Sequence, residues 1–200
     1  VMVAEDTAAR IRSALAATGY VPNKQAGLLA SGVGNIVAVL LPNLSNSIFA
    51  ETAQGLSDGL QDAGYELLIA STSYSLEREE QLLRALLGWH PAAVVVTGRR
   101  HSSATLKLLV GLKAAGTPVI EIWDHHPPAP GTQRARFTQI GFSHDEVGRA
   151  MAAHLLAAGH RRLAYVDSGV AEDYRAHERG LAFMAAARDA GALATVIASP

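Results

Sequence analysis

The chain has 200 residues, of which 49% are hydrophobic and 18% charged, and its formal net charge of -1 excludes a protein that coats nucleic acid through a global basic field. Cysteine is absent, which excludes disulfides and thiolate chemistry. No apolar run reaches the roughly 18 residues of a membrane span, and the opening Val1-Met2-Val3-Ala4-Glu5 does not have the pattern of a signal peptide.

The first part of the chain predicts two short helices and a joint. Residues 3–18 carry apolar side chains at helical spacing, and Gly19 is a typical C-terminal cap. Tyr20-Val21-Pro22-Asn23 then breaks the helix, because proline cannot continue it and asparagine can cap the next one. Residues 24–30 predict a second short helix, and residues 31–34 predict a flexible joint.

From residue 36 onward, apolar runs of strand length alternate with segments of helical periodicity. The predicted strands are Ile36–Leu41, Tyr65–Ala70, Ala92–Thr97, Pro118–Ile122, Phe137–Gly141, Arg162–Asp167 and Ala194–Ala198. The predicted helices are Ile48–Ala63, Leu76–Gly88, Ser103–Ala115, Asp145–Ala158 and Arg175–Ala190. This alternation predicts an α/β fold with a parallel sheet and right-handed crossovers.

In a parallel sheet, ligands bind at the carboxyl ends of the strands. The segments that follow the predicted strands are therefore the candidate binding segments. They are Pro42–Phe49, Ser71–Ser75, Gly98–Ser102, Trp123–His126 and Ser168–Arg175.

Five stretches carry a known pattern in their order and spacing. They are Val3–Thr7 with Arg10-Ile11, Tyr20–Leu29, Leu44–Glu51, Ile140–His144 followed by Gly148, His154-Leu155 and Gly159–Arg162, and Asp173–Ala176 with Arg179 and Phe183. Together they resemble the lactose-repressor (LacI) family of bacterial transcriptional regulators along nearly the whole chain. Within that family, Glu121–Asp124 and Gly141–His144 look most like the repressors of gluconate operons.

The resemblance implies a core like a type I periplasmic binding protein, preceded by the remnant of a helical DNA-binding head and a hinge. It assigns residues 1–32 to the last head helix and the hinge helix. It assigns residues 33–159 to the N-subdomain of the effector domain and 160–200 to the start of an incomplete C-subdomain. Family members begin with a helix-turn-helix and continue further, so we expect a fragment, and operator binding only by the full-length protein.

The function implied is that of a cytoplasmic repressor of a carbohydrate-utilisation operon, responsive to a sugar or sugar acid such as gluconate. In a homodimer, effector would change the angle between subdomains and so the fit of the hinge helices to DNA. A periplasmic-type sugar-binding protein, which shares the core fold, is the alternative. We expect no enzyme activity, because no nucleophile elbow, zinc-protease motif or dinucleotide loop occurs.

The resemblance places DNA contacts of the hinge at Asn23, Ala26 and Leu29. Leu29 would wedge between base steps in the minor groove and kink the duplex. The alternative is that Leu28 and Leu29 seal a short linker helix against the core. Gly27 lowers the helix propensity of this segment by about 1 kcal/mol relative to alanine, so its folding would depend more on DNA or a partner.

The resemblance implies effector contacts at Asp124, Arg175 and Arg179. A carboxylate such as Asp124 accepts hydrogen bonds from sugar hydroxyls, and the alternative is an exposed loop acid. The guanidinium of Arg179 offers a planar fork for the carboxylate of a sugar acid, with Arg175 as a second candidate. The alternative for Arg179 is a surface side chain paired with Glu172 or Asp173.

Three further effector contacts are predicted at Asn46, Phe49 and Thr72. Asn46 and Phe49 lie at the start of the first core helix, where free N–H groups and an aromatic wall suit a polyol, although Phe49 is equally suited to the core. Besides Gly27, two positions depart from the family pattern, since Ser47 stands where proline is usual and Ala182 where glycine is usual. Ser47 is expected to loosen the helix start.

Eight histidines raise the question of a metal site. His125 and His126 are adjacent in a proline-rich loop, where neighbouring side chains cannot easily share one ion. His154 and His160 lie on opposite sides of a helix stop. We therefore expect no metal and no cofactor.

Overall fold

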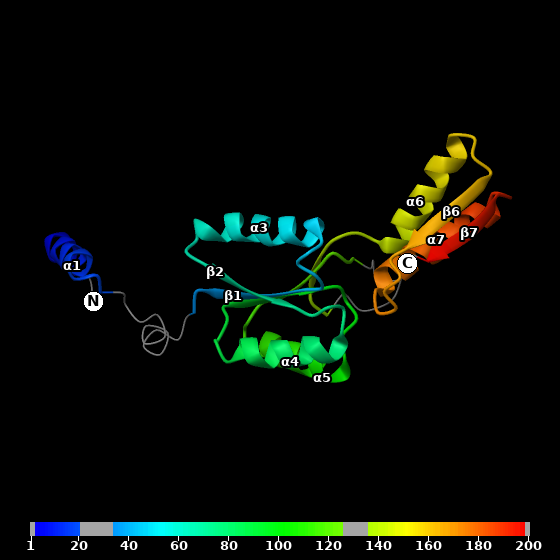
Figure 1. Ribbon diagram of the computed structural model, residues 1–200. Coiled ribbons are helices and arrows are strands. Elements are labelled where there is room, and N and C mark those ends of the chain that lie inside the picture. Colours follow the sequence, from blue (N-terminus) through cyan, green and yellow to red (C-terminus); the bar gives the residue numbers. More distant parts are fainter. Residues whose placement is uncertain (1–2, 21–33, 126–135, 199–200) are drawn as a thin grey trace. The chain divides into compact units, whose positions relative to one another are not determined.

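The computed structural model describes residues 3–20, 34–125 and 136–198 (Figure 1). The chain divides into two compact units, residues 1–34 and residues 35–200. The predicted hinge contacts Asn23, Ala26 and Leu29 lie outside the described residues. No helix among the described residues is long and apolar enough to cross a membrane.

The described part of the first unit is the helix α1 (Glu5–Thr18). It ends as predicted at Gly19, whose φ of 62° is the left-handed conformation that favours glycine at a helix end. Glu5 and Asp6 place negative charge in the first turn, where it interacts favourably with the helix dipole. No residue of α1 is buried, and Ile11 in the predicted apolar stripe is 50% exposed.

The second unit contains a parallel five-stranded sheet in the order β2-β1-β3-β4-β5. Its strands are β1 (Ile36–Leu41), β2 (Glu66–Ser71), β3 (Ala93–Thr97), β4 (Val119–Ile122) and β5 (Thr138–Ile140). In the central register Val39 lies opposite Ile69 on one side and Val95 on the other. The predicted α/β fold with a parallel sheet is therefore confirmed.

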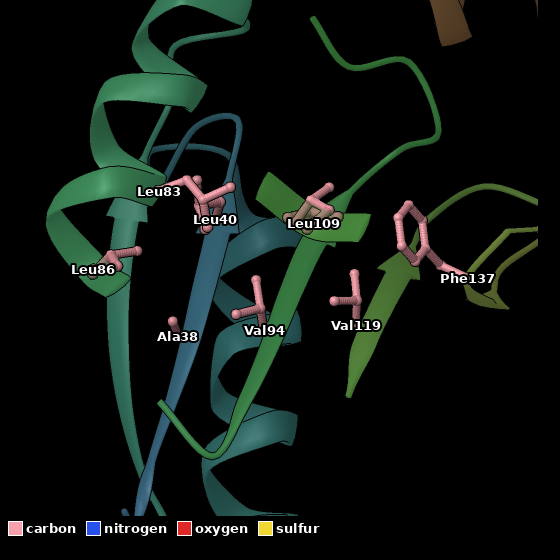
Figure 2. Close-up of a cluster of buried hydrophobic side chains, with 9 residues drawn as sticks. Ala38, Leu40, Leu83, Leu86, Val94, Leu109, Val119 and Phe137 are labelled. Atoms are coloured by element: carbon pink, nitrogen blue, oxygen red, sulfur yellow. The ribbon is translucent and has the colours of Figure 1, made fainter. Parts of the chain in front are cut away.

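Helices cover both faces of this sheet, which explains why β1 is apolar throughout (Figure 1). Val37, Val39 and Leu41 lie in a buried cluster with Phe49 of α3 (Ser47–Gln61). Successive strand residues point to opposite faces. Ala38 and Leu40 accordingly belong to a second cluster, formed with α4 (Leu76–Leu87) and α5 (Ser103–Ala114) (Figure 2).

A second, two-stranded parallel sheet pairs β6 (Arg162–Asp167) with β7 (Leu193–Ala198). Its buried cluster joins Leu163 and Tyr165 of β6 to Phe183 of α7 (Tyr174–Asp189). The helix α6 (His144–Ala157) packs against α7. Burying each such side chain contributes about 1.5–3 kcal/mol to folding.

Five of the described helices begin at a capping side chain. Each cap sets the residue at which the segment before the helix ends and the helix begins. At α3, Asn46 Oδ1 accepts from the N–H of Ile48 at 3.2 Å, so the helix begins at Ser47 without the usual proline. The other caps are Ser75 for α4, Ser102 for α5, Ser143 for α6 and Asp173 for α7. The observed elements lie within two residues of the predicted bounds.

Candidate functional site

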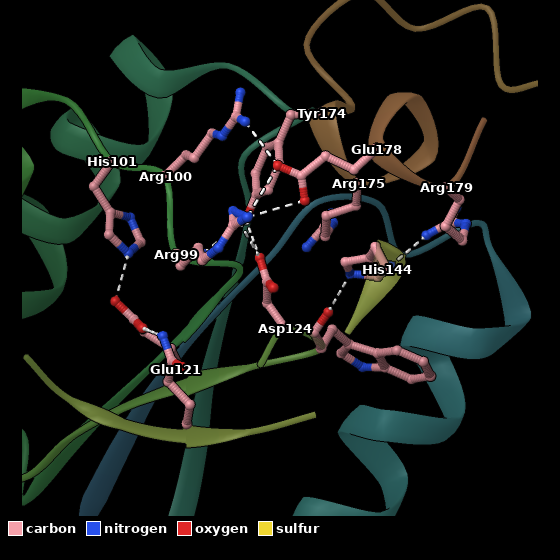
Figure 3. Close-up of polar contacts among 12 residues, drawn as sticks. Arg99, Arg100, His101, Glu121, Asp124, His144, Tyr174, Arg175, Glu178 and Arg179 are labelled. Carbon is pink, nitrogen blue, oxygen red and sulfur yellow. Dashed lines mark hydrogen bonds and ion pairs between the residues drawn. The ribbon is translucent and has the colours of Figure 1, made fainter. Parts of the chain in front are cut away.

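Charged and polar side chains gather where β3, β4 and β5 end, together with the first turns of α7 (Figure 3). They come from segments far apart in the sequence and carry charges of both signs. They are Arg99, Arg100, His101, Asp124, His144, Tyr174, Arg175, Glu178 and Arg179.

Asp124 follows β4 and is only 1% exposed, so the alternative of an exposed loop acid is wrong. The phenol of Tyr174 donates a hydrogen bond to Asp124 Oδ2 at 2.5 Å. The guanidinium of Arg99 lies 3.7 Å from the same oxygen. A buried carboxylate needs such partners, and here two different segments supply them.

Trp123 turns the chain immediately before Asp124, with a φ of 63° that is unusual for a residue other than glycine. Its neighbours hold it in place. The indole N–H donates to Thr52 Oγ1 at 2.9 Å, and the ring meets Phe49 and Phe142 edge-on at centroid distances of 6.0 and 5.8 Å. Strained backbone of this kind persists only where surrounding contacts enforce it.

Arg99 and Arg100, in the segment after β3, both bind Glu178 of α7. Arg99 donates to both carboxylate oxygens at 2.9 and 3.0 Å, and Arg100 donates to Oε1 at 2.7 Å. The Arg99 and Glu178 side chains are 19% and 22% exposed, so solvent screens this pair less than a surface pair.

Tyr174 lies at the centre of this network. Its oxygen accepts the backbone N–H of Arg99 at 2.7 Å while donating to Asp124. Burial, followed by the hydrogen bond to Asp124, raises the pKa of the Tyr174 phenol, which therefore stays protonated and remains a donor. The guanidinium of Arg100 lies over the ring, 4.5 Å from its centroid.

Gly98 allows this close approach. Its φ is 85°, and a Cβ atom at this position would lie 2.5 Å from the Tyr174 oxygen. A side chain at residue 98 would therefore both strain the backbone and push Tyr174 away from Asp124.

Arg179 donates to Nδ1 of His144 at 2.8 Å, so the alternative pairing with Glu172 or Asp173 is not observed. His144 Nε2 lies 2.9 Å from the carbonyl oxygen of Trp123, to which it donates. Burial, with the nearby charge of Arg179, lowers the pKa of His144. The neutral ring therefore links Arg179 to the turn that carries Asp124.

Arg175 is 6% exposed, and its Nε lies 3.6 Å from Asp173 Oδ1. Its Nη1 is a buried donor without a hydrogen-bond partner in the described part of the chain. Leaving such a donor unsatisfied costs about 1–3 kcal/mol, and more for a charged group. Nη1 is 3.3 Å from the position that a Cβ of Gly98 would take, which places this donor beside Arg99.

His101 lies between two carboxylates behind this network. Its Nδ1 is 2.9 Å from Glu79 Oε1, its Nε2 is 3.5 Å from Glu121 Oε1, and its side chain is 1% exposed. Burial alone would lower the pKa of His101, but the adjacent Glu121 and Glu79 outweigh it and raise the pKa to about 9. Gln139 donates to Glu121 at 2.6 Å.

The remaining predicted contacts lie around this network. Asn46 uses its side-chain oxygen to cap α3. Phe49 is 6% exposed and belongs to the core, where its ring edge meets Trp123. Thr72 is 7% exposed at the end of β2, where its N–H donates to the Leu41 carbonyl. Their roles as effector contacts stay predictions.

Six residues of the network were not predicted as site residues: Arg99, Arg100, His101, His144, Tyr174 and Glu178. A signal for Arg99, Arg100 and His101 existed, because these three residues lie in the segment Gly98–Ser102, which follows a predicted strand. Among residues 3–20, 34–125 and 136–198, no group of three or more histidine and acidic side chains could hold a metal ion.

Residues 35–197 match the family described as periplasmic binding proteins and sugar binding domain of LacI family. The HTH-type transcriptional regulator GntR of Pseudomonas aeruginosa is 36% identical over 189 residues, which are 94% of this chain and 52% of that protein. GntR of Escherichia coli strain K12 is 32% identical over 163 residues, 82% of this chain and 46% of that protein.

Among solved structures, a LacI-family transcriptional regulator from Silicibacter pomeroyi superposes with a TM-score of 0.83 at 36% identity. The match covers 99% of this chain and 57% of that one. The chain thus spans about half the length of the relatives it matches.

Proposed function

The chain belongs to the family of periplasmic binding proteins and LacI-type sugar-binding domains, and we propose that it carries the effector-binding region of a transcriptional repressor that responds to a sugar acid such as gluconate. The named relatives, which are transcriptional regulators, favour a regulator over a periplasmic sugar-binding protein. The proposed protein is a cytoplasmic homodimer that binds operator DNA through a head and hinge.

One observation carries the proposal of an anionic effector, namely the buried Nη1 of Arg175, which has no hydrogen-bond partner among the described residues. A carboxylate is the natural acceptor for a guanidinium donor. Arg179 lies one helical turn further along α7 and adds a second cation. Asp124 supplies an acceptor for effector hydroxyls, so the combination suits a molecule with both hydroxyl and carboxylate groups.

The experiment is isothermal titration calorimetry of the purified protein with gluconate and with glucitol, its neutral analogue without the carboxylate. We expect gluconate to bind more tightly than glucitol. Replacing Arg175 by glutamine should weaken gluconate binding by about 2 kcal/mol, or roughly thirtyfold, because a hydrogen bond to a charged group is lost. Glucitol binding should change much less.

Arg188→Gln is the matched control, because Arg188 is an exposed residue near the end of the same helix. Its gluconate affinity should equal that of the wild type. Equal affinity for gluconate and glucitol, or an Arg175→Gln variant that binds gluconate as well as the wild type, would contradict the proposal.

A further inference from the structure

We propose that Tyr174 and Glu178 form a clasp that, without effector, occupies the Asp124 carboxylate and the Arg99 guanidinium, the two groups to which a hydroxy-acid effector then binds. The inference rests on the proposed function and deepens it. It adds Arg99 to the effector contacts and gives the site an internal competitor.

Asp124 already accepts a hydrogen bond from Tyr174. Its Oδ2 accepts from the Tyr174 hydroxyl at 2.5 Å, and the whole residue is 1% exposed. An effector hydroxyl therefore takes the place at Oδ2 only if the Tyr174 hydroxyl leaves it. The tyrosine oxygen is also the acceptor for the Arg99 N–H, so the same departure frees a backbone donor.

Glu178 likewise holds the Arg99 guanidinium, whose Nη2 donates to both carboxylate oxygens at 2.9 and 3.0 Å (Figure 3). A carboxylate is also the group that arginine binds in an acidic ligand. Glu178 is therefore chemically equivalent to the acid group of the effector.

Helix α7 thus presents the hydroxyl of Tyr174 and the carboxylate of Glu178, and a hydroxy acid carries the same two kinds of group. Tyr174 and Glu178 lie one helical turn apart on α7, so both leave together if this end of the helix moves. The guanidinium carbons of Arg99 and Arg175 lie 5.4 and 5.7 Å from the centroid of the Tyr174 ring. Both cations therefore border the Tyr174 ring.

Two neighbouring residues, Gly98 and Arg100, accommodate and hold the clasp. Gly98 leaves the space that the Tyr174 oxygen fills, since a Cβ there would lie 2.5 Å away. Arg100 lies over the Tyr174 ring and also donates to Glu178 at 2.7 Å, which ties the two clasp residues to one neighbour. The clasp competes with the effector, so only molecules with an open clasp can bind it. The apparent affinity for the effector is therefore the intrinsic affinity multiplied by the open fraction.

The test measures gluconate affinity by calorimetry for the wild type, Tyr174→Phe, Glu178→Gln and the control Glu172→Gln. Tyr174→Phe keeps the ring that stacks on the arginines and removes only the hydroxyl, and thermal unfolding checks that each variant is folded. Both clasp variants should bind gluconate about tenfold more tightly than the wild type, because a larger fraction is open. Glu172 is exposed and outside the clasp, so its variant should bind like the wild type.

Wild-type binding of gluconate with unchanged or weaker binding by both clasp variants would overturn the clasp and leave the proposed function standing. If neither the wild type nor any variant binds gluconate, the clasp and the proposed function both fall. Tighter binding by both clasp variants, or binding that appears only in them, supports the clasp.

Discussion

At the scale of single residues, His101 is the group whose protonation depends most on its surroundings. Two carboxylates, of Glu79 and Glu121, face its ring nitrogens at 2.9 and 3.5 Å, and all three side chains are buried. The neutral ring would leave two buried negative charges without a cation, which is costly. The protonated form is therefore the one that the folded chain stabilises.

This predicts how stability changes with pH. The folded pKa of His101 is about 9, above the unfolded value of 6.5, so its stabilising contribution is complete below pH 6.5 and is lost as the pH rises through 9. His101→Gln should lose about 3 kcal/mol of stability at pH 6. Chemical denaturation at several pH values between 6 and 10 measures both quantities.

In the His101→Gln variant the decline between pH 6.5 and 9 should be much shallower than in the wild type, since the titrating group is gone. Parallel pH profiles for the two proteins would show that the charge of His101 does not stabilise the fold.

At the scale of elements, the contact between α6 and α7 depends on a glycine. A Cβ at Gly148 would lie 2.2 Å from the Arg179 carbonyl oxygen and 2.9 Å from the Ala182 Cβ. This close approach explains why a small residue serves at position 182, where the family pattern has glycine. It also holds Arg179 beside His144, 2.8 Å away.

Gly148→Ala should therefore destabilise the protein by about 1–3 kcal/mol, because the added methyl group forces the two helices apart. Thermal unfolding followed by circular dichroism measures this. Gly59→Ala is the control, since Gly59 lies inside α3 with nothing within 4 Å of an added Cβ. That variant should gain up to about 1 kcal/mol from better helix propensity. A Gly148→Ala variant as stable as the wild type would contradict the close packing.

Most elements could be predicted because their signals are local: apolar runs, helical periodicity and caps such as Ser75 and Ser102. Asp124 and Arg175 could be placed at strand and helix ends in the same way. Their partners could not. Arg99 and Glu178 are 79 residues apart, and no local pattern shows that one binds the other. The burial of Asp124 likewise depends on Tyr174, 50 residues away.

At the scale of the whole molecule, the proposal links an effector site in the second unit to DNA contacts in the first. An effector shifts an equilibrium only as far as it binds one state better than the other. The clasp supplies such a difference, because its contacts and those of the effector exclude each other at Asp124 and Arg99. Leu29 lies in the segment that would carry the response to the minor groove.

Leu29→Ala should accordingly weaken operator binding while leaving gluconate affinity nearly unchanged, because the substitution removes the proposed wedge and no effector contact. Gel-shift titration and calorimetry on the same preparation of the full-length protein give the two affinities. An equal loss of operator affinity and gluconate affinity would contradict the proposed role of Leu29.

The central claim, a repressor that responds to a sugar acid, is tested most directly by measuring how the full-length protein binds the DNA upstream of its own gene with and without gluconate. Fluorescence anisotropy with labelled duplex gives the Kd in each case, and glucitol serves as the neutral comparison. The account predicts that gluconate changes the Kd by about fivefold or more, within the usual range of allosteric coupling, and that glucitol does not. A Kd that is the same with gluconate, with glucitol and without either would contradict it.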